Sequence, residues 1–275
     1  MAEENVGPVV KGVVQGGWKE YYIYNFENTS LPASNGTSFT DVVVRFDSDA
    51  DFEVIKRHHI ATDSRIRVKL QDDAYGRQFQ NTGMDLRGVS GTILFASGVV
   101  DVGIHPNNFI PYIIPRPYLI RAGSTYTVSF SDFSGSPNSV RLTFHGAKLR
   151  VGQAPWAQQW KAKVPYTYST GSFTVGANQS ASININIQID SHFLVEKLMA
   201  VRSGPALITL KESGIGRQWM NTPVHIDNLF GNSQFPNILP APRIVARGSS
   251  LNITVQDISG SSNTIELLFD GLKLF

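Results

Sequence analysis

The chain has 275 residues, of which 41% are hydrophobic and 17% are charged, a balance typical of folded proteins and not of disordered ones. Its 24 basic and 22 acidic residues leave a net charge of only +2, so the composition indicates no nucleic-acid partner. Because cysteine is absent, disulfides and thiolate metal sites are excluded.

The chain begins with a predicted N-terminal arm, residues 1–17, which is rich in glycine and valine and has no counterpart later. The arm lacks the hydrophobic region of a signal peptide, and no apolar run in the chain approaches the about 18 residues of a membrane span. We therefore expect a protein made in a cytoplasm, without a membrane partner. Apolar residues on such an arm suggest subunit contacts, with a partly ordered tail as the alternative. The candidate contact residues are Val9, Val10, Val13 and Val14.

The stretch from Pro115 to Leu149 recurs at a constant offset of 125 positions, from Pro240 to Leu274. Asp132-Phe133-Ser134-Gly135-Ser136, for example, corresponds to Asp257-Ile258-Ser259-Gly260-Ser261. Matches without a slip predict two copies of one unit. We place a first domain at 18–150, a linker at 151–159 and a second domain at 160–275.

The expected elements of each unit are short strands. Trp18 and Trp160 begin the two units at an offset of 142, which also aligns Tyr24 with Tyr166. Isoleucines that alternate with polar residues from Ile183 to Ile189 have the period of a strand with one buried face. Helical periodicity is nowhere sustained. About eight strands per unit, with frequent turn signals, predict an all-β chain of two tandem homologous β-sandwich domains that are jelly-roll-like.

The first unit carries an insert, because residues 83–109 correspond to the shorter stretch 223–234. Two apolar runs separated by Ala96-Ser97-Gly98 predict an extra hairpin near 84–108. We expect its apolar residues to be further subunit contacts: Ile93, Leu94, Phe95, Val99 and Val100.

A repeated motif joins arginine to an aromatic residue: Arg77 with Phe79 in the first unit, and Arg217 with Trp219 in the second. Such an arginine either ties a loop to the backbone or anchors an interface, since arginine and large aromatics dominate interface hot spots. Both interpretations stay open.

No pattern nominates a metal, a cofactor or a catalytic group. Asp47, Asp49 and Asp51 have calcium-loop spacing, but the glycine and glutamate of an EF-hand are missing, which favours a solvated loop over weak calcium binding. The histidines show no metal spacing, and we expect His145 and His225 at the surface. No nucleophile elbow or phosphate loop occurs, so we predict no enzyme. Aromatic residues that could form a sugar platform are more often core residues; they are Trp18, Tyr21, Tyr22, Tyr24, Trp156 and Trp160.

The end of the second unit combines Phe235-Pro236, Leu239-Pro240-Ala241-Pro242, the Ser259-Gly260-Ser261 turn and the closing Phe269, Gly271, Lys273 and Leu274. With its counterpart in the first unit, this pattern resembles domains of virion proteins of tailed bacteriophages. It implies a non-enzymatic virion structural protein of the capsid, collar or tail, such as a decoration, connector or tail accessory protein. As implied partners we expect other virion proteins and copies of the chain in a symmetric homo-oligomer, assembled in the host cytoplasm. The alternative is a tandem carbohydrate-binding β-sandwich protein.

Overall fold

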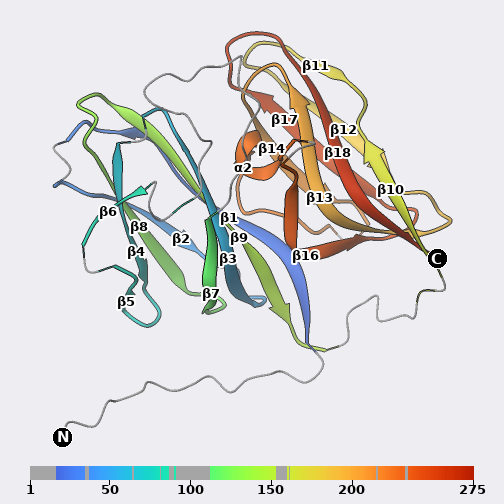
Figure 1. Ribbon diagram of the computed structural model, residues 1–275, viewed down its shortest axis with the longest axis horizontal. Helices are drawn as coiled ribbons and strands as arrows, with labels where there is room; N and C mark the ends of the chain where they lie inside the picture. The colour runs from blue at the N-terminus through green and yellow to red at the C-terminus, as the bar shows by residue number, and fades with distance from the viewer. Residues whose placement is uncertain are drawn as a thin grey trace, which may run out of the picture.

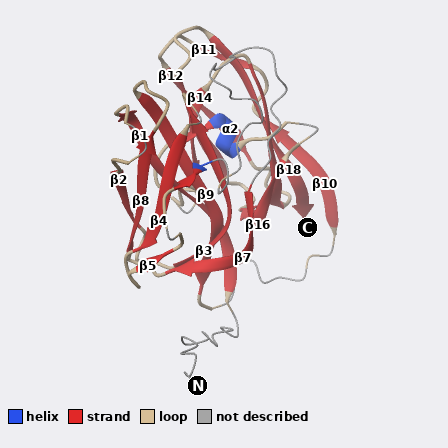
Figure 2. Cartoon of the chain, turned by 60° about the vertical axis from the view of Figure 1, so that its left-hand side comes forward, coloured by secondary structure: helices blue, strands red, loops and turns tan. Residues whose placement is uncertain are grey.

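The structure is a computed structural model that describes residues 17–34, 37–63, 65–80, 82–86, 90, 112–152, 160, 162–214, 216–232 and 235–275. The contact residues proposed in the arm and the insert, Val9 to Val14 and Ile93 to Val100, lie outside these ranges. The described residues are almost all β-strand, which confirms the all-β prediction (Figure 2). None of their helices has the length and hydropathy needed to cross a membrane.

The first unit is a sandwich of two antiparallel sheets. One sheet has the order β1 (Trp18–Leu31), β9 (Asn138–Arg150), β3 (Asp51–Ala61), β7 (Tyr112–Ile120). The other has the order β2 (Thr40–Arg45), β8 (Thr125–Asp132), β4 (Ile66–Asp72), β5 (Arg77–Gln78), with β6 (Met84–Asp85) also pairing with β4.

The second unit repeats this order. Its first sheet runs β10 (Lys163–Ser169), β18 (Asn263–Leu274), β13 (His192–Arg202), β16 (Asn237–Val245), with β11 (Phe173–Val175) beside β18. Its second sheet runs β12 (Ser180–Asn186), β17 (Ser250–Asp257), β14 (Ala206–Glu212), β15 (Val224–His225), and the short helix α2 (Ile226–Leu229) follows β15. Two facing sheets connected in this order form a jelly roll. Descent of the two units from one doubled module remains a prediction.

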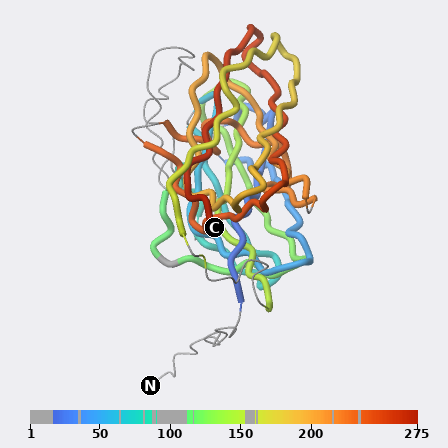
Figure 3. Tube along the Cα trace, turned by 90° about the vertical axis from the view of Figure 1, so that its right-hand side faces the viewer, coloured from blue at the N-terminus to red at the C-terminus, as the bar shows by residue number. Residues whose placement is uncertain are grey.

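The units lie side by side, the first drawn in blue to green and the second in yellow to red (Figure 1). Seen from the side of the second unit, the two overlap over much of their height (Figure 3). Strand β1 contributes to both hydrophobic cores: Tyr22, Tyr24 and Phe26 belong to the core of the first unit, whereas Tyr21 and Ile23 belong to that of the second. Both faces of β1 are therefore buried.

The expected alignment of Tyr24 with Tyr166 is wrong by two residues. Tyr22 lies opposite Gly146 and Tyr166 lies opposite Gly271, so Tyr22 corresponds to Tyr166 and Tyr24 to Tyr168. The tyrosine hydroxyls explain the difference. The Tyr24 hydroxyl accepts a hydrogen bond from the amide of Asp47 at 3.0 Å, and the Tyr168 hydroxyl accepts one from the amide of Gln188 at 3.2 Å. These contacts fix the register more firmly than the outlying tryptophans do.

Each unit also carries the same β-bulge. It interrupts β3 between Val54 and Lys56, and β13 between Val195 and Lys197. A glycine of the neighbouring strand stands at each bulge, Gly146 in the first unit and Gly271 in the second. A Cβ at either glycine would overlap the carbonyl oxygen of Glu53 or Leu194. The bulge therefore requires glycine there.

Candidate functional site

The most elaborate arrangement of side chains lies where the two units meet, which we call the seam. The outer face of β1, β9 and β3 contacts the 217–223 loop, α2 and β16 of the second unit. At its centre, the amide of Ile23 donates to the carbonyl of Trp219 at 3.0 Å, and the amide of Asn221 donates to the carbonyl of Ile23 at 3.2 Å. The Trp219 ring is fully buried and meets Tyr21 edge-on, with 6.1 Å between ring centroids.

An ion cluster closes one end of the seam. The carboxylate of Glu20 pairs with Arg150 at 2.8 Å, with Arg243 at 3.1 Å and with Arg217 at 3.4 Å. The side chains of Glu20 and Arg243 are each only 3% exposed. Burial lowers the pKa of Arg243 to about 10, because the low-dielectric interior disfavours its charged form. Since the cluster draws on both units, it ties them together by charge.

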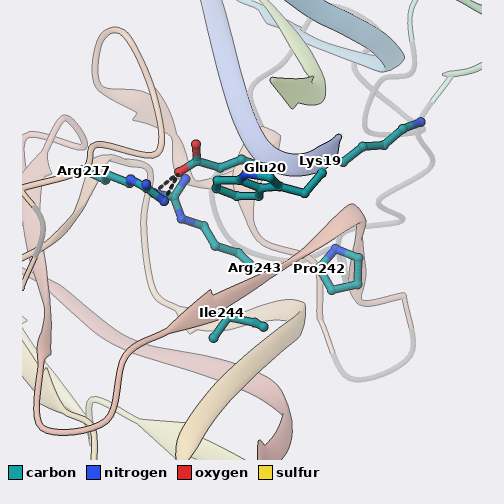
Figure 4. Close-up of a pocket in the computed structure, with 7 residues that line it drawn as sticks. Lys19, Glu20, Arg217, Pro242, Arg243 and Ile244 are labelled. Atoms are coloured by element: carbon teal, nitrogen blue, oxygen red, sulfur yellow. Dashed lines mark hydrogen bonds and ion pairs between the residues drawn. The ribbon is translucent and has the colours of Figure 1, made fainter. Parts of the chain in front are cut away.

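A small pocket of about 110 Å³ opens beside this cluster (Figure 4). The figure shows Arg217 and Arg243 directed toward Glu20, with Pro242 and Ile244 below them. Arg217 stacks over the ring of Trp18 at 5.3 Å, and Arg243 over the ring of Trp219 at 4.8 Å. The cations are thus held by Glu20 and by aromatic faces. The pocket therefore lies within the contact between the units, and the charged groups of Glu20, Arg217 and Arg243 that line it are already paired with one another.

A second polar cluster, of Lys56, His58 and His145, lies further along the seam. The Lys56 ammonium donates to the side-chain oxygen of Asn237 at 2.5 Å and to the carbonyl of Ile238 at 2.7 Å. His58 Nδ1 lies 3.1 Å from the carbonyl of Asn228, and His145 Nδ1 lies 2.7 Å from the hydroxyl of Tyr21. Burial lowers the pKa of Lys56 to about 7 and lowers the pKa of both histidines well below the usual value.

Hydrogen bonds between neutral side chains fix the orientation of the units. Asn228 donates to the Thr143 hydroxyl at 3.0 Å, and that hydroxyl donates to the side-chain oxygen of Asn25 at 3.0 Å. The backbone amide of Asn25 in turn donates to the side chain of Asn221 at 2.8 Å. A buried polar group without a hydrogen-bond partner costs free energy. These bonds therefore favour the one relative orientation of the two units in which all of them are formed.

The seam has the chemistry of a structural joint. Among the described residues, no group of three or more His, Asp or Glu side chains could hold a metal ion. The buried histidines face a hydroxyl and a carbonyl. The arginines that line the small pocket beside Glu20 are already paired with its carboxylate.

Two of the predicted site residues, Arg217 and Trp219, lie in the seam, where they contact the first unit of the same chain. Their counterparts lie elsewhere: Arg77 pairs with Asp72 at 3.1 Å, and the Phe79 ring stacks on Tyr118 with 4.5 Å between centroids. The Arg77 side chain is 46% exposed. A role of these four residues between subunits remains a prediction.

The expectation that His145 and His225 lie at the surface is wrong, because both side chains are buried. His145 lies on the outer face of β9, which would be exposed if the first unit stood alone but is covered by the second unit. Tyr21, Tyr22 and Tyr24 are also buried, which leaves them unable to form a sugar platform. Trp156 lies outside the described residues.

The three aspartates with calcium spacing do not converge. Lys148 places its ammonium 2.6 Å from Asp47 and 3.1 Å from Asp49, and Asp51 accepts a hydrogen bond from the amide of Ala122 at 2.9 Å. The second unit has a similar arrangement, in which Lys273 contacts Gln188 and Asp190. A lysine thus neutralises the pair of carboxylates, as in a structural loop.

Sequence reasoning did not identify Glu20, Arg243 or Lys56. One available signal is the uninterrupted run from Tyr21 to Tyr24. A strand covered on both faces is apolar throughout instead of alternating. The run could therefore have indicated that β1 lies between two cores.

Lowering the pH from 7 to 4 is expected to reduce the free energy of unfolding. Burial lowers the pKa of His225 to about 4, and it lowers the pKa of His58 and His145 as well. Below the unfolded value of about 6.5, the unfolded chain takes up protons that the folded chain does not, so stability is full above pH ~6.5 and is lost as the pH falls. For His225 alone the loss is on the order of 3 kcal/mol.

Urea unfolding at a series of pH values measures this dependence. The variant His145→Asn is expected to show a shallower pH slope than the wild type. Burial also lowers the pKa of His192, but less far than that of His145, so His192→Asn is expected to change the slope less. An unchanged slope in His145→Asn would contradict the assignment.

Comparison with known proteins finds no family model and no curated protein that matches the chain. Among solved structures, the chain is similar to the major capsid protein P2 of bacteriophage PM2, at 12% identity over 93% of this chain and 98% of that one, with a TM-score of 0.26. It is also similar to the Macrobrachium rosenbergii nodavirus structure, at 10% identity over 99% and 96%, with a TM-score of 0.20. A third is the tandem CBM22-1–CBM22-2 domain of Paenibacillus barcinonensis Xyn10C, at 9% identity over 96% and 95%, with a TM-score of 0.19. Similarities at this level carry no argument about function.

Proposed function

We propose that the chain is a non-enzymatic structural protein of a virus particle, whose copies associate through their jelly-roll units into a symmetric protein assembly. Jelly rolls occur in viral capsids, lectins and cupins, so the fold is compatible with this role and does not decide it. The argument for self-association comes from one sheet face of the second unit.

The observation that carries the proposal is a difference between two equivalent faces. In the first unit, the outer face of β1, β9 and β3 is covered by the second unit of the same chain. In the second unit, none of the described residues covers the matching face of β10, β18 and β13, which we call the open face. Thr143, Ala147 and His58 are buried in the seam, whereas their counterparts Leu268, Leu272 and Met199 are partly exposed.

The open face is strongly apolar at its edge. Val201 on β13 is 65% exposed and Ile238 on β16 is 62% exposed. Large apolar side chains exposed on one sheet face are a feature of contact sites. The equivalent face of the first unit is covered by the second unit of the same chain. We therefore expect the open face of the second unit to be covered by another chain.

In the seam, the 217–223 loop of the second unit covers the first unit. The equivalent loop of the first unit is the one that carries Arg77 and Phe79. We expect this loop of a neighbouring chain to cover the open face.

The charge available for this pairing on the open face is that of Glu266, while the loop presents Arg77, whose side chain is 46% exposed. Asp270 on the same face is already paired with Lys197 at 2.9 Å. A contact between two different surfaces is heterologous, and heterologous contacts close into rings when the rotation permits. The seam would then be the intrachain example of a repeated contact.

The substitution Met199→Asp tests the proposal. It places a carboxylate in the centre of the open face, where burial against another chain would leave it unpaired. By light scattering, we expect the wild-type protein to have the mass of several chains of 30.2 kDa each. We expect the variant to associate more weakly, with a dissociation constant at least about 10-fold higher than that of the wild type. Thr209→Asp, on the opposite sheet of the same unit, is the control and should leave the mass unchanged. A wild-type mass of one chain would contradict the proposal.

A further inference from the structure

Most edges of the four sheets are blocked against pairing with another strand. An exposed edge presents unpaired backbone donors and acceptors, and proteins blunt such edges with proline, charge, short strands or a cover. Three edge strands carry proline: β7 has Pro115 and Pro117, β16 has Pro240 and Pro242, and β10 has Pro165. Strand β2 has a charged residue near each end, Asp41 and Arg45. Strands β5, β6 and β15 are two residues long. The edge β1 contacts Trp219 to Asn221 in the seam.

Strand β12 has none of these features. Its seven residues, Ser180–Asn186, include no proline, no charge and no bulge, and they pair with β17 in unbroken register. Among the described residues, β17 is the one strand that pairs with β12, which lies at the edge of its sheet (Figure 1). A strand edge that no described strand occupies is a site at which a strand can be added.

The side-chain pattern of β12 is regular and compatible with pairing to itself. Ala181, Ile183 and Ile185 face the core of their own unit, and the intervening serines and asparagines are exposed. In an antiparallel pair centred on Ile183, core-facing residues of one strand lie opposite core-facing residues of the other, and Ser182 lies opposite Asn184. Because the strand carries no charge, no like charges are brought together.

We propose that β12 pairs with β12 of a second copy of this chain, antiparallel about a two-fold axis, so that two sheets become one continuous sheet. The contact is isologous, in contrast to the head-to-tail contact proposed above. It lies on the other sheet of the second unit and does not depend on that contact. An assembly with both contacts can link one ring of chains to the next.

A cysteine cross-link tests the pairing directly, because the chain contains no cysteine of its own. Opposed residues of an antiparallel pair have Cα atoms about 4.5–5.5 Å apart, within the range of a disulfide. The variant Ser182→Cys/Asn184→Cys is expected to form disulfide-linked dimers in high yield under mild oxidation. Asn252→Cys/Thr254→Cys, which has the same spacing on the neighbouring strand β17, is the matched control. Equal dimer yields from the two variants would overturn the proposal.

A charge exchange provides an independent test. The double variants Ser182→Lys/Asn184→Lys and Ser182→Asp/Asn184→Asp are each expected to weaken β12 pairing at least about 10-fold. A mixture of the two is expected to restore it, because residues 182 and 184 lie opposite each other and then carry opposite charges. Thermal unfolding confirms that each variant is folded. Pairing by either variant alone at wild-type strength would contradict the two-fold contact. Met199→Asp should leave the disulfide yield unchanged, which separates a failure of this contact from a failure of the head-to-tail contact.

Discussion

Replacing Gly271 with alanine is expected to lower the free energy of unfolding by about 3 kcal/mol or more. The added methyl group would overlap the carbonyl oxygen of Leu194 at the bulge of β13. Both strands lie in the interior of a sheet, so neither backbone can move aside without breaking hydrogen bonds. Gly146→Ala should have a similar effect, through the carbonyl of Glu53.

Gly260→Ala is the matched control. Gly260 has a φ of 73° and no heavy atom within 4 Å of the position of a Cβ. Its replacement should therefore cost only the backbone strain of a left-handed residue, about 1 kcal/mol. Urea-induced unfolding measures all three variants, and equal losses at Gly260 and Gly271 would show that the bulge does not require glycine.

Replacing Glu20 with alanine is expected to cost about 3–5 kcal/mol, because the substitution leaves Arg243 buried without its carboxylate. Arg150 and Arg217 lose the same partner, but they are more exposed, with 20% and 31% of their side chains accessible. The free energy of unfolding by urea is the measurement. The double variant Glu20→Ala/Arg243→Met should lose less than the sum of the two single variants, because the uncompensated charge is then absent.

Lys19→Ala provides the comparison within the same strand. Lys19 pairs with Glu53 at 2.5 Å, but its side chain is 53% exposed, and exposed ion pairs contribute at most about 1 kcal/mol. If Glu20→Ala cost no more than Lys19→Ala, the cluster at the seam would not hold the units together.

The sequence was sufficient to predict what depends on local pattern. The alternation from Ile183 to Ile189 predicted a strand with one buried face, and β12 covers residues 183–186 of that stretch. The pattern extends too far, because β12 ends at Asn186 and Ile189 is 82% exposed. Turn residues such as Ser259-Gly260-Ser261 correctly marked the end of one strand and the start of the next.

What depends on contacts between the units could not be predicted in this way. His145 alternates with inward-facing residues on β9, as a surface residue would, and nothing near it in the chain indicates that another unit covers it. Glu20 and Arg243 are separated by more than two hundred positions and meet only because β16 reaches the seam. The register of β1 was misjudged because a tryptophan pair was used to align the units, whereas the hydroxyls of Tyr24 and Tyr168 fix it.

Tyr21 and Ile23 project from a strand of the first unit into the core of the second. If the chain were cut between the units, the second unit would have a cavity in its core. The first unit would expose Tyr21 and Ile23 to water. Repetition of a strand order does not make the copies autonomous. We therefore expect the two units to unfold together in one cooperative transition.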